Sequence, residues 1–246
     1  MNDIQAVILA GGQGKRLGTD LPKCMLDLHG KKLIDICIEN LILNGFNEYT
    51  FLLGYKYDLV VKHLSKYTNM KIRYSIDADT SVSWGKGKAL KHAILNGTID
   101  RNKRALVTFP DDIILDTLVY KKLIKEHLNA VNKYNVSATV ILASGTRYPY
   151  GTAKLYKNNL IYEFEEKPFI NIPTNIGIYI FEPDVYDLII QNIDLNHPEP
   201  LELESIIMPI LAKEGKLNGF LIDAKKWLPI NTKKDYDTAL KIFAVH

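Results

Sequence analysis

The sequence predicts an α/β protein with a mixed, mainly parallel central sheet flanked by helices and a small β-rich extension. Three observations carry this prediction. In the first half, short apolar runs alternate with helical patterns, which is typical of βαβ units. After residue 112, strand-like runs follow one another with short connections. The 246 residues, 47% of them hydrophobic, suffice for a substantial core.

The first half has the pattern of a doubly wound sheet. Residues 6–10 form an apolar run that stops at Gly11 and Gly12, as a buried central strand does. Residues 33–43 are apolar on most sides and end before Gly45, which predicts a buried helix. The other expected strands are 49–53, 71–76 and 105–109, and the other expected helices are about 59–64 and 88–95.

The second half is predicted to be rich in strands. An Asn158-Asn159 turn joins two of them. Pro209 interrupts a helical pattern over 203–213, so we expect that helix to kink or to form two pieces. Thr232 and Asp235 form a capping box before a final helix. The expected strands are 137–143, 152–156, 160–164 and 176–181.

Composition narrows the class of protein. With 31 Lys and Arg against 28 Asp and Glu, the net charge of +3 is too small and too dispersed for a nucleic-acid binder. No apolar run reaches the roughly 18 residues of a membrane span, and the N-terminus lacks a basic segment and cleavage site. We therefore expect a cytoplasmic protein. Cys24 and Cys37 lack metal-ligand spacing and are expected to be buried.

No linker interrupts the chain, so residues 1–246 are expected to form a single domain. Its halves would cover about 1–135 and about 136–246, with the second closing over the first.

A glycine-rich loop follows the first strand, LAGGQGKRLGTDLPKCM over residues 9–25. Glycines let backbone N–H groups approach an anion, and Arg16 and Lys23 add fixed cations. Glycines alone would favour a simple turn; the two cations favour a phosphate site. The spacing excludes a Walker loop, because Leu9 stands in place of its first Gly, and a dinucleotide fingerprint, because Leu17 stands in place of its last.

The run G-G-x-G-x-R-L followed by P-K resembles the sugar-1-phosphate nucleotidylyltransferases, or nucleotide-sugar pyrophosphorylases. Further segments match in the same order: WGKGKALKHA from residue 84, a strand ending at Asp111, F-x-E-K-P near 164–168 and N-x-G-x-Y-x-F from 175. The resemblance implies a Rossmann-like fold whose first half binds nucleotide and whose second half binds sugar phosphate. The chain carries no hexapeptide repeats, so we expect no left-handed β-helix domain.

The resemblance also assigns residues. Arg16, Lys23 and Asp111 would be catalytic. Mg²⁺ would be held by Asp111 and by Asn231, since Pro229 stands where most relatives carry an Asp. From the residues alone, Asp111 could cap a turn and Asn231 could begin a helix. The nucleotide would contact Leu9, Ala10, Gly11, Gly12, Gly14, Lys15, Arg16, Lys23 and Gly85, and the sugar phosphate would contact Gly151, Glu166, Lys167 and Asn175.

The implied reaction converts a nucleoside triphosphate and a sugar 1-phosphate into a nucleotide-sugar and pyrophosphate, with Mg²⁺. Glucose 1-phosphate is favoured by family frequency. The base is left open, with contacts expected from Leu9, Ala10 and residues 79–85, and a homo-oligomer is also left open. A cytidylyltransferase for phosphocholine and a non-catalytic nucleotide-sugar sensor are the alternatives. A nicotinamide-dependent oxidoreductase fails on glycine spacing.

Overall fold

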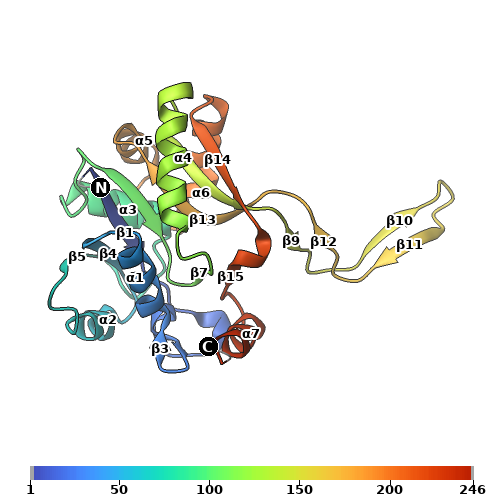
Figure 1. Cartoon of the computed structure of the whole chain (residues 1–246), viewed down its shortest axis with the longest axis horizontal. Helices are drawn as coiled ribbons and strands as arrows, with labels where there is room; N and C mark the ends of the chain where they lie inside the picture. The colour runs from blue at the N-terminus through green and yellow to red at the C-terminus, as the bar shows by residue number, and fades with distance from the viewer. Residues whose placement is uncertain (1–2, 245–246) are drawn as a thin grey trace.

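The fold is built around a seven-stranded sheet in the computed structural model, which describes residues 3–244 (Figure 1). The strand order is β14-β8-β13-β6-β1-β4-β5, and β13 runs antiparallel to both of its neighbours while the other pairs are parallel. The strands are β1 Ile4–Leu9, β2 Asp27–Leu28, β3 Lys31–Lys32, β4 Glu48–Leu53, β5 Lys71–Ile76, β6 Arg104–Thr108, β7 Asp112–Ile114, β8 Ala138–Ala143, β9 Thr146–Arg147, β10 Thr152–Leu155, β11 Ile161–Glu165, β12 Phe169–Ile170, β13 Thr174–Phe181, β14 Leu217–Ile222 and β15 Trp227–Pro229. The helices are η1 Lys15–Leu17, η2 Lys23–Met25, α1 Leu33–Leu43, α2 Tyr57–Leu64, α3 Lys86–Leu95, α4 Val119–Tyr134, α5 Asp184–Asn192, α6 Leu203–Lys213, η3 Ala224–Lys226 and α7 Lys233–Phe243. The predicted fold class is confirmed.

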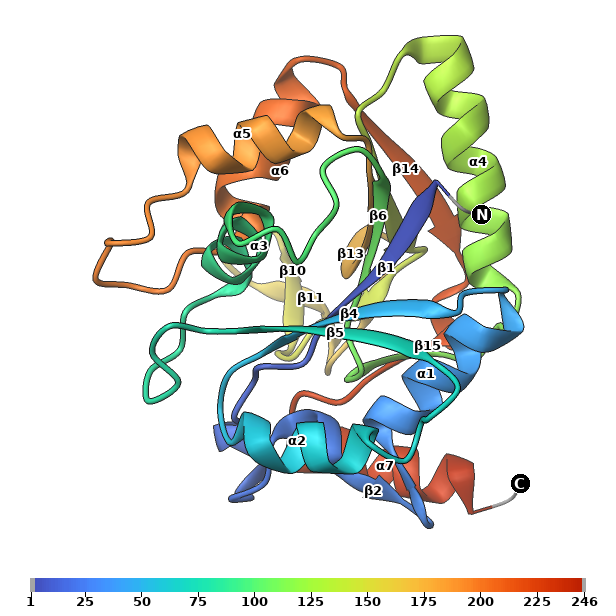
Figure 2. The same cartoon turned by 90° about the vertical axis from the view of Figure 1, so that its left-hand side faces the viewer.

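Helices cover both faces of the sheet (Figure 2). Side chains alternate along β1: Ala6 and Ile8 join a core cluster with residues of α1, α2 and α4, whereas Val7 and Leu9 join one with residues of α3, α5 and α6. Cys24 and Cys37 are buried, as expected. Among residues 3–244, no helix combines the length and apolar character needed to cross a bilayer.

Most expected elements form where the sequence predicts them. Helix α1 spans Leu33–Leu43, and the capping box is present, with the Asp235 backbone N–H donating to Thr232 Oγ1. Helices α4 and α5 and strand β14 were not among the predicted elements. Of the two outcomes expected for the 203–213 helix, a kink or two pieces, the second is wrong, because α6 continues through Pro209. Burial of Leu203 and Leu211 against the core outweighs the one backbone hydrogen bond that proline removes.

A two-stranded ribbon projects from the body (Figure 1). We call residues 146–172 the arm. Strand β10 pairs with β11 through the predicted asparagine turn, in which Asn159 has a φ of 66°. At the base of the arm, β9 pairs with β12. The expectation that the second half closes over the first is wrong for this segment, because no third strand among the described residues pairs with the ribbon and holds it against the body.

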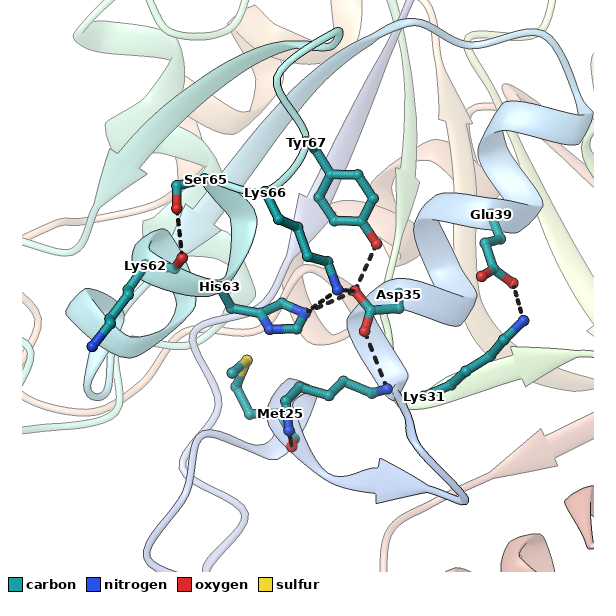
Figure 3. A network of polar contacts seen from close by, with 10 residues as sticks. Met25, Lys31, Asp35, Glu39, Lys62, His63, Ser65, Lys66 and Tyr67 are labelled. Atoms are coloured by element: carbon teal, nitrogen blue, oxygen red, sulfur yellow. Dashed lines mark hydrogen bonds and ion pairs between the residues drawn. The ribbon is translucent and has the colours of Figure 1, made fainter.

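A buried carboxylate joins α1 to α2 beside the glycine-rich loop (Figure 3). Asp35 accepts a hydrogen bond from Tyr67 Oη at 2.6 Å and lies 2.7 Å from His63 Nε2 and 2.9 Å from Lys66 Nζ. Burial alone would raise the pKa of Asp35. The contacts with Tyr67, His63 and Lys66 outweigh burial and lower this pKa to about 2.

We expect Asp35→Asn to lower the free energy of unfolding by about 2 kcal/mol at pH 7, because the native state favours the ionised carboxylate. A depressed pKa stabilises the fold above the unfolded value of 3.8, and this stabilisation is lost as the pH falls towards about 2. Urea titrations of both proteins should therefore show a difference that shrinks below about pH 4.

Glu39→Gln is the matched control, since Glu39 lies on the same helix but pairs with Lys31 in solvent. This change should cost less than about 0.5 kcal/mol. Equal losses for the two variants would contradict the role given to Asp35.

Candidate active site

A cavity of about 500 Å³ lies at the carboxyl ends of four parallel strands. The chain runs from β1 to β4 to β5 and then returns to the other side of β1 with β6, which opens a crevice at this edge. Leu9 ends β1, Leu52 lies at the end of β4, Asp77 follows β5 and Phe109 follows β6, and all four line the cavity.

The glycine-rich loop forms the floor of this cavity. A Cβ on Gly11 would lie 3.0 Å from the backbone N of Gly54, so the close approach of the loop to β4 requires glycine here. The backbone N–H of Lys23 donates to the carbonyl of Gly12 at 2.9 Å. Gly14 has a φ of 68°, which begins the short helix η1. The loop therefore turns back on itself and brings η1 and η2 to the same opening.

Fixed contacts hold the tip of the loop. Asp20 accepts hydrogen bonds from Lys56 Nζ at 2.6 Å and Tyr55 Oη at 2.7 Å, and these contacts lower its pKa. Lys15 and Arg16, in η1, line the cavity. Neither of these two cations forms an ion pair with any residue in the described range 3–244, so both charges are available to an anion.

Three predicted site residues meet at one point of the cavity wall. Lys23 Nζ donates to Asp111 Oδ2 and, at 2.9 Å, to Asn231 Oδ1. The ladder between β7 and β15 pairs Pro229 with Asp112, which carries Asn231 to this position. Pro229 itself does not line the cavity.

The oxygens of Asp111 and Asn231 already face one cation, the Lys23 ammonium. Within residues 3–244, no group of three or more His, Cys, Asp or Glu side chains is arranged to hold a metal. One carboxylate with one amide oxygen nevertheless suits Mg²⁺, which keeps waters and substrate phosphates as its other ligands. Asp112 lies behind Asp111 and accepts a hydrogen bond from Trp227 Nε1, and burial raises the pKa of Asp112.

Asp77 is a cavity residue that the sequence analysis missed. Burial raises the pKa of its carboxyl to about 7. Its Oδ2 lies close to Gly54, where a Cβ would come within 2.6 Å of it. The sequence contained a usable signal, namely a carboxylate at the end of a predicted strand. Asp77 directly follows the predicted strand 71–76, and Asp111 comes shortly after the predicted strand 105–109.

The start of α3 forms the opposite wall. Gly85 lines the cavity with a φ of 80°, and a Cβ there would lie 2.5 Å from the carbonyl O of Leu201. Two lysines of α3 have fixed partners in the protein. Lys88 is buried and donates to the carbonyl of His197, and Lys91 Nζ donates to the Ile193 carbonyl at 2.6 Å. These two hydrogen bonds hold the segment that follows α5 against α3.

The predicted sugar-phosphate residues lie outside the cavity lining. Gly151 and Glu166 belong to the arm, and a Cβ on Gly151 would lie 2.6 Å from the Phe164 ring. Lys167 Nζ lies 3.4 Å from Glu166 Oε1. Asn175 is exposed in β13. The structure does not bring these four residues together with the glycine-rich loop, and their role stays a prediction.

A chain of polar contacts does link Asn175 to the cavity wall. Asn175 Nδ2 donates to Tyr179 Oη at 2.9 Å, and Tyr179 Oη donates to Glu204 Oε1 at 2.7 Å. The same oxygen accepts from Lys86 Nζ, which lies 4.9 Å from the centre of the Phe109 ring. This chain sets the position of the Lys86 ammonium at the cavity.

Comparisons with known proteins agree with this geometry. A family model described as Nucleotidyl transferase matches residues 5–244. The mannose-1-phosphate guanyltransferase of Schizosaccharomyces pombe is 26% identical over 252 residues, which cover 98% of this chain and 64% of that protein. The mannose-1-phosphate guanylyltransferase catalytic subunit beta of Xenopus tropicalis is also 26% identical, over 250 residues. The chain thus spans 64% of the length of these curated relatives.

Solved structures share the fold. HddC from Yersinia pseudotuberculosis, also determined in complex with GMP-PN, has a TM-score of 0.68 at 22% identity and covers 97% of this chain and 99% of its own. A putative glucose-1-phosphate thymidylyltransferase from Bacillus anthracis has a TM-score of 0.70 at 22% identity and covers 98% of this chain and 95% of its own.

Proposed function

The chain belongs to the nucleotidyl transferase family, and from this premise we propose that it joins a nucleoside triphosphate to a sugar 1-phosphate. An oxygen of the sugar phosphate attacks the α-phosphorus, and the bond from the α-phosphorus to the oxygen bridging to the β-phosphate breaks. Pyrophosphate leaves, and the product is a nucleotide-sugar. The attacking oxygen is already anionic, so the protein needs no general base.

One observation carries the proposal. The glycine-rich loop, the cations Lys15 and Arg16, and the contact of Lys23 with Asp111 and Asn231 all face the same cavity. Its volume of about 500 Å³ is within the usual range of a small-molecule site. Such an arrangement supports alignment of phosphates and neutralisation of their charge, which is most of what phosphoryl transfer requires.

Each cation has a separate task in this mechanism. Arg16 and the loop N–H groups hold the β- and γ-phosphates, which become the leaving pyrophosphate. Lys23 bridges the α-phosphate and the incoming sugar phosphate. Because charge moves between these groups during the reaction, a fixed ammonium stabilises the transition state more than the ground state.

Mg²⁺ is the cofactor that we propose, held by Asp111 and Asn231. When bound, it would neutralise charge on the α-phosphate. Asp111 and Asn231 would orient the ion from the end of β6 and the start of α7, and Lys23 would keep its place beside the phosphates.

For the base we propose guanine, and Asp77 supports this choice. Guanine presents adjacent N1–H and N2–H₂ donors on one edge, and the two oxygens of a carboxylate can accept both. Asp77 is a half-buried carboxylate in the cavity lining, and its partial burial disfavours the ionised form. The names of the curated relatives also point to guanine.

For the acceptor we propose mannose 1-phosphate. Family frequency alone favours glucose 1-phosphate, but the curated relatives that match nearly the whole chain are named for mannose 1-phosphate. Glucose 1-phosphate remains the competing substrate to compare.

The test is pyrophosphate release with Mg²⁺ across GTP, ATP, CTP, UTP and dTTP against mannose, glucose and heptose 1-phosphates and phosphocholine. We expect GTP with mannose 1-phosphate to give the highest kcat/KM. Turnover of CTP with phosphocholine alone would identify a cytidylyltransferase. Binding of a nucleotide-sugar without turnover of any pair would identify a sensor.

We expect Asp77→Asn to lower kcat/KM for GTP by about 100-fold, because the amide can accept only one of the two guanine hydrogen bonds. Inosine triphosphate lacks the 2-amino group and serves as the matched substrate. Wild type should prefer GTP to inosine triphosphate by about tenfold, and this preference should disappear in the variant. An unchanged preference would contradict the contact.

The pH dependence offers a second check of Asp77. Its raised pKa means that the carboxyl becomes protonated as the pH falls below about 7 and then loses an acceptor for guanine. KM for GTP should therefore rise below that pH in wild type but much less in Asp77→Asn.

A further inference from the structure

The arm exposes an unusual amount of apolar surface. Ten of its large apolar side chains are at least two-fifths exposed. They are Tyr148, Tyr150, Leu155, Tyr156, Leu160, Ile161, Tyr162, Phe164, Phe169 and Ile172. Together they present on the order of 1,000 Å², whereas the largest apolar patch of a typical monomer covers about 300–600 Å².

The apolar residues of the ribbon gather on one face. Cross-strand neighbours point to the same side, and Ala153 pairs with Phe164. Leu155 stands two residues after Ala153 and Tyr162 two residues before Phe164, so both alternate to that side. A register shift between Lys154 and Leu155 pairs Leu155 with Ile161, which adds Ile161 to the same side. Phe164, Leu155 and Tyr162 are 64%, 57% and 52% exposed.

The other face of the ribbon is polar. Thr152 pairs with Glu165, and Lys154 pairs with Glu163 and forms an ion pair with it. This alternation is typical of a sheet with one covered and one solvated face. Among the described residues, however, no helix or third strand covers the apolar face.

A ribbon of this kind needs a partner that covers its apolar face in solution. A two-stranded hairpin alone is marginally stable in water, and both of its strands have an unpaired edge. A second copy of the chain is present whenever the first is. Burial of most of these ten side chains on each copy would approach the roughly 800 Å² per partner of a standard interface.

Charge distinguishes this partner from a membrane surface. Lipid-binding elements carry an excess of Lys and Arg on their polar face. Here the polar face holds Glu163 and Glu165 against Lys154. The whole arm carries nearly balanced charge: four basic residues, Arg147, Lys154, Lys157 and Lys167, and three acidic residues, Glu163, Glu165 and Glu166. Two arms therefore neither repel each other nor favour an anionic surface.

We propose that the arm is a dimerisation element, whose apolar face packs against the same face of a second copy. A two-fold axis would bring Phe164 and Tyr162 of each copy into the centre of the interface, where buried aromatic residues contribute most to affinity. The polar faces remain in solvent. This proposal does not depend on the activity proposed above.

Sedimentation velocity of the whole chain over a concentration series tests the proposal. We expect wild type to be a dimer at about 10 μM. The double variant Tyr162→Gln, Phe164→Gln should raise the dimer Kd by at least about 100-fold. The matched control is Glu163→Gln, Glu165→Gln, which places the same residue type on the polar face of the same strand and should leave the Kd within about threefold.

Two further measurements keep the result interpretable. Far-UV circular dichroism should be unchanged in both variants, because the arm contributes nothing to the core of the body. The thermal midpoint of the apolar-face variant should match that of wild type diluted below its dimer Kd, because only association separates the two. Hydrogen exchange of residues 152–165 should be slow in the wild-type dimer and fast in the apolar-face variant. A wild type that stays monomeric at about 100 μM, or a Kd that both variants change equally, would overturn the proposal. So would a monomer that binds anionic phospholipid vesicles through the arm.

Discussion

Lys23→Ala is expected to lower kcat by about 1,000-fold. Lys23 contacts both Asp111 and Asn231, and in the proposed reaction its ammonium meets the α-phosphate and the attacking sugar phosphate. Removing a fixed charge from a preorganised site costs about 10²–10³ in turnover, and bridging two reacting groups places Lys23 at the upper end. Steady-state kinetics with GTP and mannose 1-phosphate measure the effect, which should appear in kcat more than in KM.

Lys62→Ala controls for the loss of a surface lysine. Lys62 is exposed on α2 and does not line the cavity. Its removal should leave kcat within about twofold. Because loss of Lys23 leaves Asp111 without its cation, thermal unfolding of the variant must show a folded protein before its kinetics are interpreted. If folded Lys23→Ala turned over at the wild-type rate, the mechanism would be wrong.

Asp111→Asn is expected to lower kcat/KM by about 1,000-fold at fixed Mg²⁺, because a neutral amide holds the ion much more weakly than a carboxylate. The variant should also need a higher Mg²⁺ concentration for half-maximal activity. A titration with Mg²⁺ and then Mn²⁺ measures this midpoint separately from the maximal rate.

Asp116→Asn provides the comparison for Asp111. Asp116 lies five residues further along and pairs with Lys122 and Lys226 away from the cavity. The Mg²⁺ midpoint should not move in this variant. An unmoved midpoint in Asp111→Asn as well would mean that substrate phosphates alone hold the metal, and the role given to Asp111 would be withdrawn.

Local patterns predicted much of the fold because the signals are short-range. Helix α1 ends before a glycine with positive φ, and the final helix begins at its capping box, so both boundaries follow from adjacent residues. Pro209 shows the limit of such rules. Its local preference predicts an interruption, but packing of the same helix on the sheet is energetically larger and keeps it continuous.

The arm shows a second limit. Its turn at Asn158-Asn159 and its alternating strands were predictable, since both depend on neighbours in sequence. Its direction was not, because a ribbon attached only at its base is positioned by contacts that no local pattern encodes. For this reason Gly151 and Glu166, which the resemblance assigns to the sugar phosphate, lie away from the cavity lining.

The sequence by itself determined which chemical groups the site would contain: a glycine-rich loop, Arg16, Lys23 and Asp111, in an order typical of one family. Only the tertiary structure decided that Lys23 meets Asn231, 208 residues away, and that Asp77 shares their cavity. The physical reason is that composition and spacing act over a few residues. The meeting of distant side chains depends on strand order in the sheet and on the β7–β15 ladder, which form only when the whole core packs.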